Sequence, residues 1–229
     1  MDVGTPQFWL ASLEIVVINI LLSGDNAVVI ALACRNLPGR QRTWGVILGA
    51  TGAVVLRIVL TAFAVELLGL PWLKLLGGSA LLWIGVKLIA GDAHEEGADP
   101  EIVASDRLWA AVRTVVVADL VMSIDNVLGV AAAAKGSVPL LVFGLLVSIP
   151  LVVAGSQIIL RLVERFPILI LAGGGLLGWI AGDMIVDDEA LAAWIDSNAG
   201  WLEWSMPAAG VVLVIAVAKW MERRRAVAP

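Results

Sequence analysis

The stretch LLSGDNAVVIALA, residues 21–33, places an aspartate and an asparagine in a segment that is otherwise almost entirely apolar. About one hundred residues later the stretch LVMSIDNVLGVA, residues 120–131, repeats the pattern. An ionised carboxylate inside a lipid bilayer costs at least about 2.5 kcal/mol unless it finds a partner. The fold and the function of this chain therefore depend on what these two Asp-Asn pairs do.

The composition is that of an integral membrane protein. The chain has 229 residues, of which 60% are hydrophobic and 15% are charged, and its mean hydropathy is +0.96. Soluble domains have roughly 45–50% apolar and about 25% charged residues. A single cysteine, Cys34, excludes a disulfide within the chain.

Seven segments are long and apolar enough to cross a bilayer as helices, which needs roughly 20 residues each. We expect an all-α fold, a polytopic membrane helix bundle that forms one transmembrane domain over residues 1–229. The predicted spans cover residues about 9–33, 44–68, 72–90, 108–134, 138–162, 167–186 and 205–221.

The placement of Lys and Arg predicts the orientation of the bundle. Ten basic residues fall on one side of the predicted spans: Arg35, Arg40, Arg42, Arg107, Arg161, Arg165, Lys219, Arg223, Arg224 and Arg225. The other side has only Lys74 and Lys135. Because basic loops stay in the cytoplasm, we expect a cytoplasmic (inner) membrane protein with its N-terminus outside and its C-terminus inside.

The two motifs belong to an internal repeat. At an offset of 100, Trp9, Ala11, Asn19, Ser23, Asp25 and Asn26 align with Trp109, Ala111, Asp119, Ser123, Asp125 and Asn126. Further on, the segment from Pro71 resembles the segment from Pro167 at an offset of 96. Repeat one covers about 9–90, repeat two about 108–186, and one extra helix follows at about 205–221. Three spans is an odd number, so the copies are predicted to be inverted. Inverted repeats are common in secondary transporters, which bind substrate between the copies; a duplication kept only for packing is the alternative.

The polar residues on the repeat predict a site for a hard divalent cation. At about 1.5 Å per residue, Asp25 and Asp119 lie at nearly the same depth, and Asn19 and Asp125 form a second level. Carboxylate, amide and hydroxyl oxygens suit Mg²⁺, Ca²⁺ or Mn²⁺. The predicted metal ligands are Asp25, Asn26, Asp119, Asp125 and Asn126, with hydroxyls from Ser23 and Ser123 nearby. Helix capping or packing is the alternative role for these pairs.

Three further residues are candidates for coupling or auxiliary roles: Glu14, Asn19 and Arg57. Arg57, at the depth of Asp25, is either a structural counter-ion or the charge that keeps an empty site neutral. Glu14 is either a relay or ligand, or an interfacial residue. Asp25 points about 100° away from Asn26 on an ideal helix, so a shared ion requires the helix to unwind. Gly24 permits that break, whereas Ile124 at the matching position of the second copy does not favour it.

The segments LSGDNAVVIALA and DLVMSIDNVLGVAAAA resemble the two signature segments of the TerC family of integral membrane proteins, particularly its short YjbE-type members. The resemblance covers most of the chain and implies a member of the LysE-like exporter group. It also implies an association with manganese export and homeostasis, and it carries over Asp25, Asn26, Asp125 and Asn126 as functional positions with Asp119 beside them. Asn19 opposite Asp119 departs from a fully symmetric two-metal site.

The resulting prediction is a secondary transporter that exports a divalent metal cation, Mn²⁺ above all, in exchange for protons. Proton exchange rests only on the titratable groups in the pathway, and export on the resemblance. Mn²⁺ would be transported substrate, with no permanently bound cofactor. No Walker A motif and no nucleophile–base motif occurs, so neither ATP-driven transport nor an enzyme is expected. The expected partners are the metal ion and the lipid bilayer, with a homo-oligomer or secretion machinery as further options and no nucleic acid. The alternative functions are a membrane-protein assembly or secretion partner, and an exporter of an amino acid or other organic cation.

Overall fold

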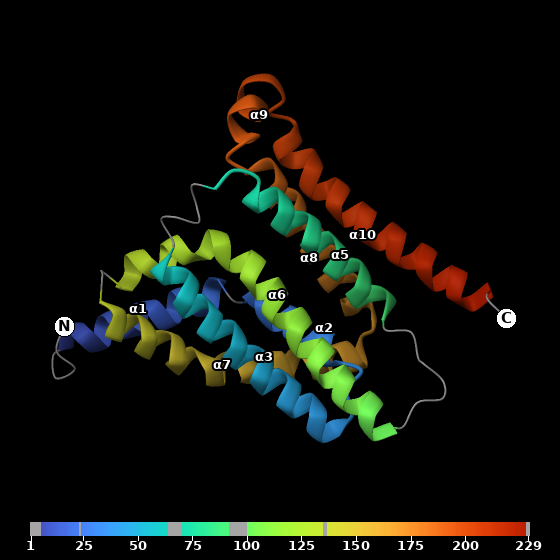
Figure 1. The fold of residues 1–229 in the computed structure, drawn as a ribbon, viewed down its shortest axis with the longest axis horizontal. Helices are drawn as coiled ribbons and strands as arrows, with labels where there is room; N and C mark the ends of the chain where they lie inside the picture. The colour runs from blue at the N-terminus through green and yellow to red at the C-terminus, as the bar shows by residue number, and fades with distance from the viewer. Residues whose placement is uncertain (1–5, 23, 64–69, 92–99, 135–136, 228–229) are drawn as a thin grey trace. The chain divides into compact units, whose positions relative to one another are not determined.

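The computed structural model describes residues 6–22, 24–63, 70–91, 100–134 and 137–227, and every regular element in these ranges is an α-helix (Figure 1). The helices are α1 Pro6–Leu22, α2 Gly24–Cys34, α3 Gly39–Ala62, α5 Leu73–Ala90, α6 Pro100–Ala134, α7 Val138–Arg165, α8 Ile168–Val186, α9 Ala192–Asn198 and α10 Leu202–Val227. The expectation of an all-α protein is confirmed.

Each predicted span coincides with helical structure. The first one is two helices, α1 and α2, which end and begin on either side of residue 23, whereas α6 is continuous over 35 residues. By length and hydropathy five described helices can cross a membrane: α3, α5, α7, α8 and residues 202–225 of α10. These confirm a helical, multi-pass membrane protein; the seven-span arrangement as a whole stays a prediction.

Local sequence explains several helix ends. Asp25 lies in the first turn of α2, where a negative charge interacts favourably with the helix dipole. Residue Pro38 precedes α3 in an extended conformation, which suits the last residue before a helix. Helix α5 is followed by Gly91 at φ 69°, and the Gly91 amide donates to the carbonyl of Lys87. Glycine adopts such a positive φ without strain because it has no Cβ, which suits it to the end of this helix.

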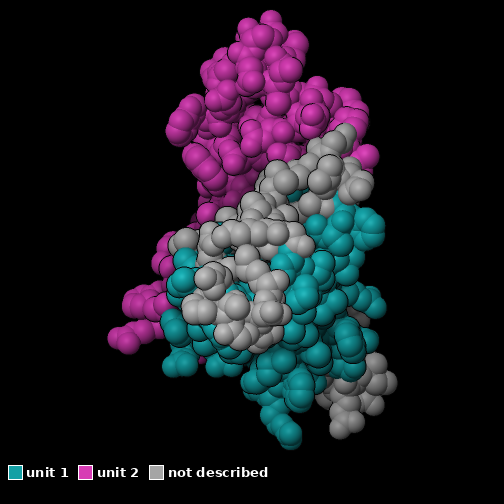
Figure 2. Space-filling view, turned by 90° about the vertical axis from the view of Figure 1, so that its left-hand side faces the viewer, with its two compact units in different colours: residues 1–68, 101–161 teal, residues 69–100, 162–229 magenta. Residues whose placement is uncertain are grey.

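The chain divides into two compact units (Figure 2). Unit 1 contains residues 1–68 and 101–161, and unit 2 contains residues 69–100 and 162–229. Unit 1 therefore holds the first two predicted spans of each repeat copy, and unit 2 holds the third span of each copy together with α9 and α10. The prediction of a single transmembrane domain over 1–229 is not tested by this division into units.

Unit 1 contains two large apolar clusters. In the first, Ile15 of α1 packs with Val54 of α3 and Leu145 of α7. In the second, Ile30 of α2 packs with residues of α3, α6 and α7, including Val115 of α6. Helices α1 and α2 thus pack into separate clusters, and the start of α2 lies beside α3 and α6.

Unit 2 is built on close helix contacts at glycines. A Cβ atom added to Gly178 of α8 would lie 2.5 Å from the carbonyl oxygen of Gly210 in α10, so the two backbones touch. Val86 and Ile89 of α5 pack against Val214 of α10. Small residues at contacts between membrane helices allow this close approach.

Paired contacts relate the two repeat copies to each other. In unit 2, a Cβ on Gly78 would meet the Ala181 carbonyl at 2.7 Å, and one on Gly174 would meet the Gly85 carbonyl at 3.4 Å. The offset of 96 converts the first pair into the second. The contacts also make α5 and α8 antiparallel, because residue numbers rise in one helix as they fall in the other.

Unit 1 shows the same relation. Gly49 of α3 packs on Val115 of α6, and Gly144 of α7 packs on Ile15 of α1. Ile15 and Val115 are partners at the offset of 100, so Gly49 and Gly144 occupy matching places. Such exchanged contacts are expected if a two-fold axis relates the copies; the inverted repeat across a membrane remains a prediction.

Candidate functional site

A buried polar cluster lies in unit 1 where α2, α3 and α6 meet. The Arg57 guanidinium, on α3, donates from Nη2 to Asp119 Oδ1 at 2.7 Å and from Nε to Ser123 Oγ at 3.1 Å. Asn26 Nδ2, on α2, donates to Asp119 Oδ1 at 2.9 Å, and Ser123 Oγ donates to Asp119 Oδ2 at 3.1 Å. The cluster therefore joins the first two predicted spans of copy one to the first span of copy two.

The charges of this cluster are almost fully removed from solvent. Arg57 is 2% exposed, Asp119 3% and Ser123 0%. Burying two charges is costly, and their mutual attraction offsets the cost only with close geometry and additional hydrogen bonds. The bonds from Asn26 and Ser123 supply this for the Asp119 carboxylate. Arg57 was expected to be either a structural counter-ion or the charge that keeps an empty site neutral. Both roles require an ion pair, and the structure shows this pair with Asp119.

Beside Asp119 lies a small cavity with an unsatisfied oxygen near it. The cavity, of about 10 Å³, is lined by Asn26, Val29, Ile30, Ala53, Val115 and Asp119. Such a volume is roughly what one water molecule needs. Asn26 is 5% exposed, and its Oδ1 is buried without a hydrogen-bond partner among the described residues. A buried amide oxygen of this kind normally has a partner, so an additional electropositive group would be favourable here.

Asp25 occupies the start of α2 next to this cluster. Its Oδ1 accepts from the backbone amide of Asn26 at 2.7 Å, and its side chain is half-buried. It lies close enough to Arg57 and Asp119 for electrostatic interaction with both. The expectation that Asp25 and Asp119 share one level across a membrane stays a prediction.

The second predicted level, Asn19 and Asp125, is not described by the structure. The side chains of Glu14, Asn19 and Asp125 lie outside the described residues, and Asn126 is half-buried on α6. Within the described ranges, no three His, Cys, Asp or Glu side chains come together in a way that holds a metal ion. The full five-residue ligand set therefore stays a prediction.

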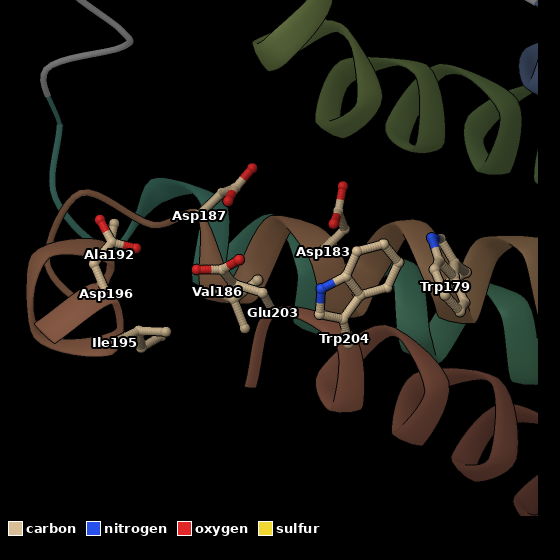
Figure 3. Close-up of a pocket in the computed structure, with 9 residues that line it drawn as sticks. All are labelled: Trp179, Asp183, Val186, Asp187, Ala192, Ile195, Asp196, Glu203 and Trp204. Carbon is tan, nitrogen blue, oxygen red and sulfur yellow. The ribbon is translucent and has the colours of Figure 1, made fainter. Parts of the chain in front are cut away.

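A second hollow, of about 230 Å³, lies in unit 2 between α8, α9 and α10 (Figure 3). It is lined by Trp179, Asp183, Val186, Asp187, Ala192, Ile195, Asp196, Glu203 and Trp204. Its four carboxylates are exposed, and no Lys, Arg or His occurs between Arg165 and Lys219. The hollow is acidic, and it contains none of the predicted site residues.

One structurally important residue, Asp188, was missed by sequence reasoning. This fully buried aspartate follows α8, and its carboxylate accepts from the backbone amides of Trp72 and Leu75 at 3.0 Å each, at the start of α5. It also accepts from the Ala190 amide at 2.9 Å. Burial alone would raise the pKa of Asp188, but these backbone hydrogen bonds together hold it below its ordinary value. A cap provided from more than one hundred residues away has no local sequence signal.

Comparison with known proteins decides the family. The sequence profile described as "Integral membrane protein TerC family" matches residues 4–226. The chain belongs to the TerC family. The resemblance of its two Asp-Asn segments to that family is thereby confirmed, over nearly the whole length.

Several relatives of this TerC protein are similar over most of their length. "Uncharacterized membrane protein YjbE" of Bacillus subtilis is 44% identical over 209 residues, which are 91% of this chain and 94% of the relative. "Uncharacterized membrane protein YceF" of the same organism is 30% identical over 77% of this chain and 70% of the relative. "UPF0053 inner membrane protein YgdQ" of Escherichia coli is 27% identical over 71% and 74%. No solved structure matches the chain.

These findings establish the TerC protein as a multi-pass integral membrane protein, and the Escherichia coli relative is called an inner membrane protein. The orientation of the termini stays a prediction, as do the transported substrate and the partners.

Proposed function

We propose that this TerC protein is a secondary transporter that exports a divalent metal cation, with Mn²⁺ as substrate, across the cytoplasmic membrane. The observation that carries the proposal is the small cavity beside Asp119, where the buried Asn26 Oδ1 has no hydrogen-bond partner among the described residues. A carboxylate and an unsatisfied amide oxygen at one buried cavity provide ligands of the type that hard cations prefer.

Two further observations favour a small divalent ion. Asp25 and Asp119 interact electrostatically and supply two carboxylates, the kind of ligand that hard divalent ions prefer. A cavity of about 10 Å³ has no room for an amino acid, which argues against the organic-cation alternative. The choice of Mn²⁺ and of export comes from the resemblance to the TerC family.

The separation of α1 from α2 would serve this function. Because α2 begins at Gly24, Asp25 and Asn26 both lie in the first turn of a helix, near Asp119 of α6. Broken helices are typical of substrate sites in secondary transporters, where helix movements give access from alternate sides. In repeat two the matching segment is the continuous helix α6, so the helix movements that give access to the site would occur mainly in repeat one.

The assembly or secretion partner remains the second candidate, and one observation favours it. Both oxygens of Asp119 already have hydrogen-bond donors within the protein, as they would in a cluster that serves only to hold helices together. The two candidates differ in whether the protein alone moves metal.

The deciding experiment is Mn²⁺ flux in proteoliposomes containing the purified protein. We expect flux with the wild type, loss of at least about 90% of it with Asp119→Asn, and wild-type flux with Asp106→Asn, an exposed aspartate on the same helix. Asp125→Asn extends the test to the second motif. Thermal unfolding of each variant in detergent shows whether it is folded.

Asp119→Asn leaves Arg57 buried without its carboxylate partner, which is destabilising by about 3–5 kcal/mol. The double variant Arg57→Met with Asp119→Asn removes both charges and is expected to fold, so it reports on flux without that penalty. Absence of wild-type Mn²⁺ flux under any pH gradient or membrane potential would reject the transporter and favour the assembly partner.

A further inference from the structure

The Arg57 guanidinium occupies the position of a bound cation in the proposed site. It contacts Asp119 Oδ1 at 2.7 Å and Ser123 Oγ at 3.1 Å, two of the oxygen ligands that a divalent ion would use. An arginine keeps its charge in proteins at all accessible pH values, so the only way to compensate it in a buried place is an anion. Arg57 and Asp119 are therefore expected to be paired in most molecules that hold no other cation at this carboxylate.

A carrier must return empty after it releases its ion, and bare buried carboxylates oppose that step. An uncompensated charge in the membrane interior is costly, and many carriers remove the cost by binding a second ion for the return. In this protein the compensating charge is covalently part of the chain, on α3, and it is already paired with Asp119, with both residues 2–3% exposed.

We infer that Arg57 is a tethered counter-cation: it competes with the transported divalent ion for Asp119, and it allows the empty carrier to return without a co-transported ion. This inference rests on the proposed function and specifies how the return of the empty carrier is made possible. Instead of protons, which the titratable groups alone suggested, the Arg57 side chain replaces the divalent ion at Asp119.

The repeat shows that this counter-cation exists in one copy only. Gly49 and Gly144 occupy matching places in the two copies. Arg57 is eight residues after Gly49, and the residue eight after Gly144 is Val152. The polar residues around Asp119 thus include a cationic side chain, Arg57. At the matching position of the other repeat copy the residue is the apolar Val152.

Competition makes a prediction about affinity. If an ion binds only to molecules in which the Arg57–Asp119 pair is broken, its apparent Kd equals the intrinsic Kd divided by the fraction of such molecules. If Arg57 leaves Asp119 in about a tenth of the molecules, removal of the guanidinium tightens binding by about tenfold. Arg57→Gln is therefore expected to lower the Kd for Mn²⁺, measured on purified protein by electron paramagnetic resonance of the free ion. An unchanged or higher Kd would overturn the inference.

Two transport measurements distinguish the return of the empty carrier from the movement of the carrier with bound Mn²⁺. With Mn²⁺ on both sides of a proteoliposome, tracer exchange needs only the loaded carrier, whereas net efflux into Mn²⁺-free buffer needs the empty return. We expect Arg57→Gln to retain tracer exchange and to lose net efflux by about tenfold or more, because its empty carrier contains an uncompensated carboxylate. Arg57→Lys, which retains the positive charge, is the matched control and is expected to retain net efflux in part.

A further test of the inference uses only the wild-type protein. Net Mn²⁺ efflux is expected with the membrane potential clamped and no pH gradient, and it is expected to proceed without proton movement. A strict requirement for counter-moving protons would overturn the inference even if Arg57→Gln fails to fold. Equal effects of Arg57→Gln on exchange and net efflux would also overturn it, whereas a wild type that performs neither exchange nor efflux would reject the proposed function instead.

Discussion

The Arg57–Asp119 pair sets the stability of unit 1 at the scale of single residues. Arg57→Ala is expected to lower the free energy of unfolding by about 3–5 kcal/mol, because it leaves a buried carboxylate without its counter-charge. Arg57→Met together with Asp119→Leu is expected to cost far less, since apolar residues of similar volume often replace a buried ion pair without loss. Thermal unfolding in one detergent compares the variants. A double variant less stable than Arg57→Ala would contradict this account.

Asp188 is expected to stabilise unit 2 through the start of α5. Asp188→Ala removes the acceptor for the Trp72 and Leu75 amides, and loss of such a cap costs about 0.5–2 kcal/mol. Asp187→Ala, at the neighbouring exposed position, is the control and is expected to change little. The measurement is the unfolding temperature at neutral pH, and equal effects of the two substitutions would show that the cap is unimportant.

The same cap has a predictable pH dependence. Its backbone donors hold the folded pKa of Asp188 below its ordinary value, so its contribution is present above the unfolded pKa of about 3.9. That contribution is lost as pH falls through the lowered folded pKa. The difference in unfolding temperature between wild type and Asp188→Ala should therefore be constant from neutral pH to about pH 5 and shrink in stronger acid. A difference that grows in acid would contradict the assignment.

Sequence reasoning predicted part of this residue-level picture. Helix rise alone placed Asp25, Asp119 and Arg57 at one depth, and in the structure Arg57 pairs with Asp119 while Asp25 interacts electrostatically with both. Depth does not determine which side chains pair, and the bond from Asn26 to Asp119 depends on how α2 and α6 pack. Asp188 stood outside the prediction because its partners are distant in sequence.

At the scale of helices, the contact of α8 with α10 depends on glycine. Gly178→Ala is expected to destabilise unit 2 by about 1–3 kcal/mol, since the new methyl group would lie 2.5 Å from the backbone oxygen of Gly210 and backbone atoms cannot move aside cheaply. Gly175→Ala, one turn earlier on α8, meets only side-chain atoms at 3.4 and 3.6 Å and is the matched control. Unfolding in detergent measures both, and a similar loss for the two would show that helix propensity or lipid contact governs the effect.

Helix positions were predictable where apolar length decided them. The structure has helical residues at each predicted span; α1 ends at Leu22 and α2 begins at Gly24, where the sequence permits unwinding, whereas α6 continues through Ile124. The short helix α9 was not predicted because its seven residues, AAWIDSN, are too few and too polar for a hydropathy signal. The exchanged glycine contacts required coordinates, because a sequence offset does not specify which helices touch.

At the scale of the whole chain, the two repeat copies contribute to both units. Each unit contains corresponding helices from copy one and copy two, such as α5 and α8 in unit 2. The copies have nevertheless diverged at the polar cluster, where Arg57 and Asp119 of one arrangement correspond to Val152 and Asn19 of the other. This difference between the copies favours one charged site in a protein built from two similar halves over two equivalent sites.

The predicted orientation of the chain can be tested on α10, which joins an acidic end to a basic end. Its 26 residues extend about 39 Å at 1.5 Å per residue, more than the roughly 30 Å of a bilayer core. In a Cys34→Ser background we expect an impermeant maleimide to label Ser197→Cys in intact cells. We expect the same reagent to label Glu222→Cys only after permeabilisation, because Glu222 lies beside Arg223, Arg224 and Arg225.

Both test positions are exposed, so poor accessibility within the protein does not explain a missing signal. Labelling of Glu222→Cys but not Ser197→Cys in intact cells would reverse the orientation and place the basic side outside, against the usual distribution of charge. Labelling of both would remove α10 from the membrane. The expected pattern would place the acidic hollow between α8, α9 and α10 on the outer face, where its carboxylates would attract cations electrostatically.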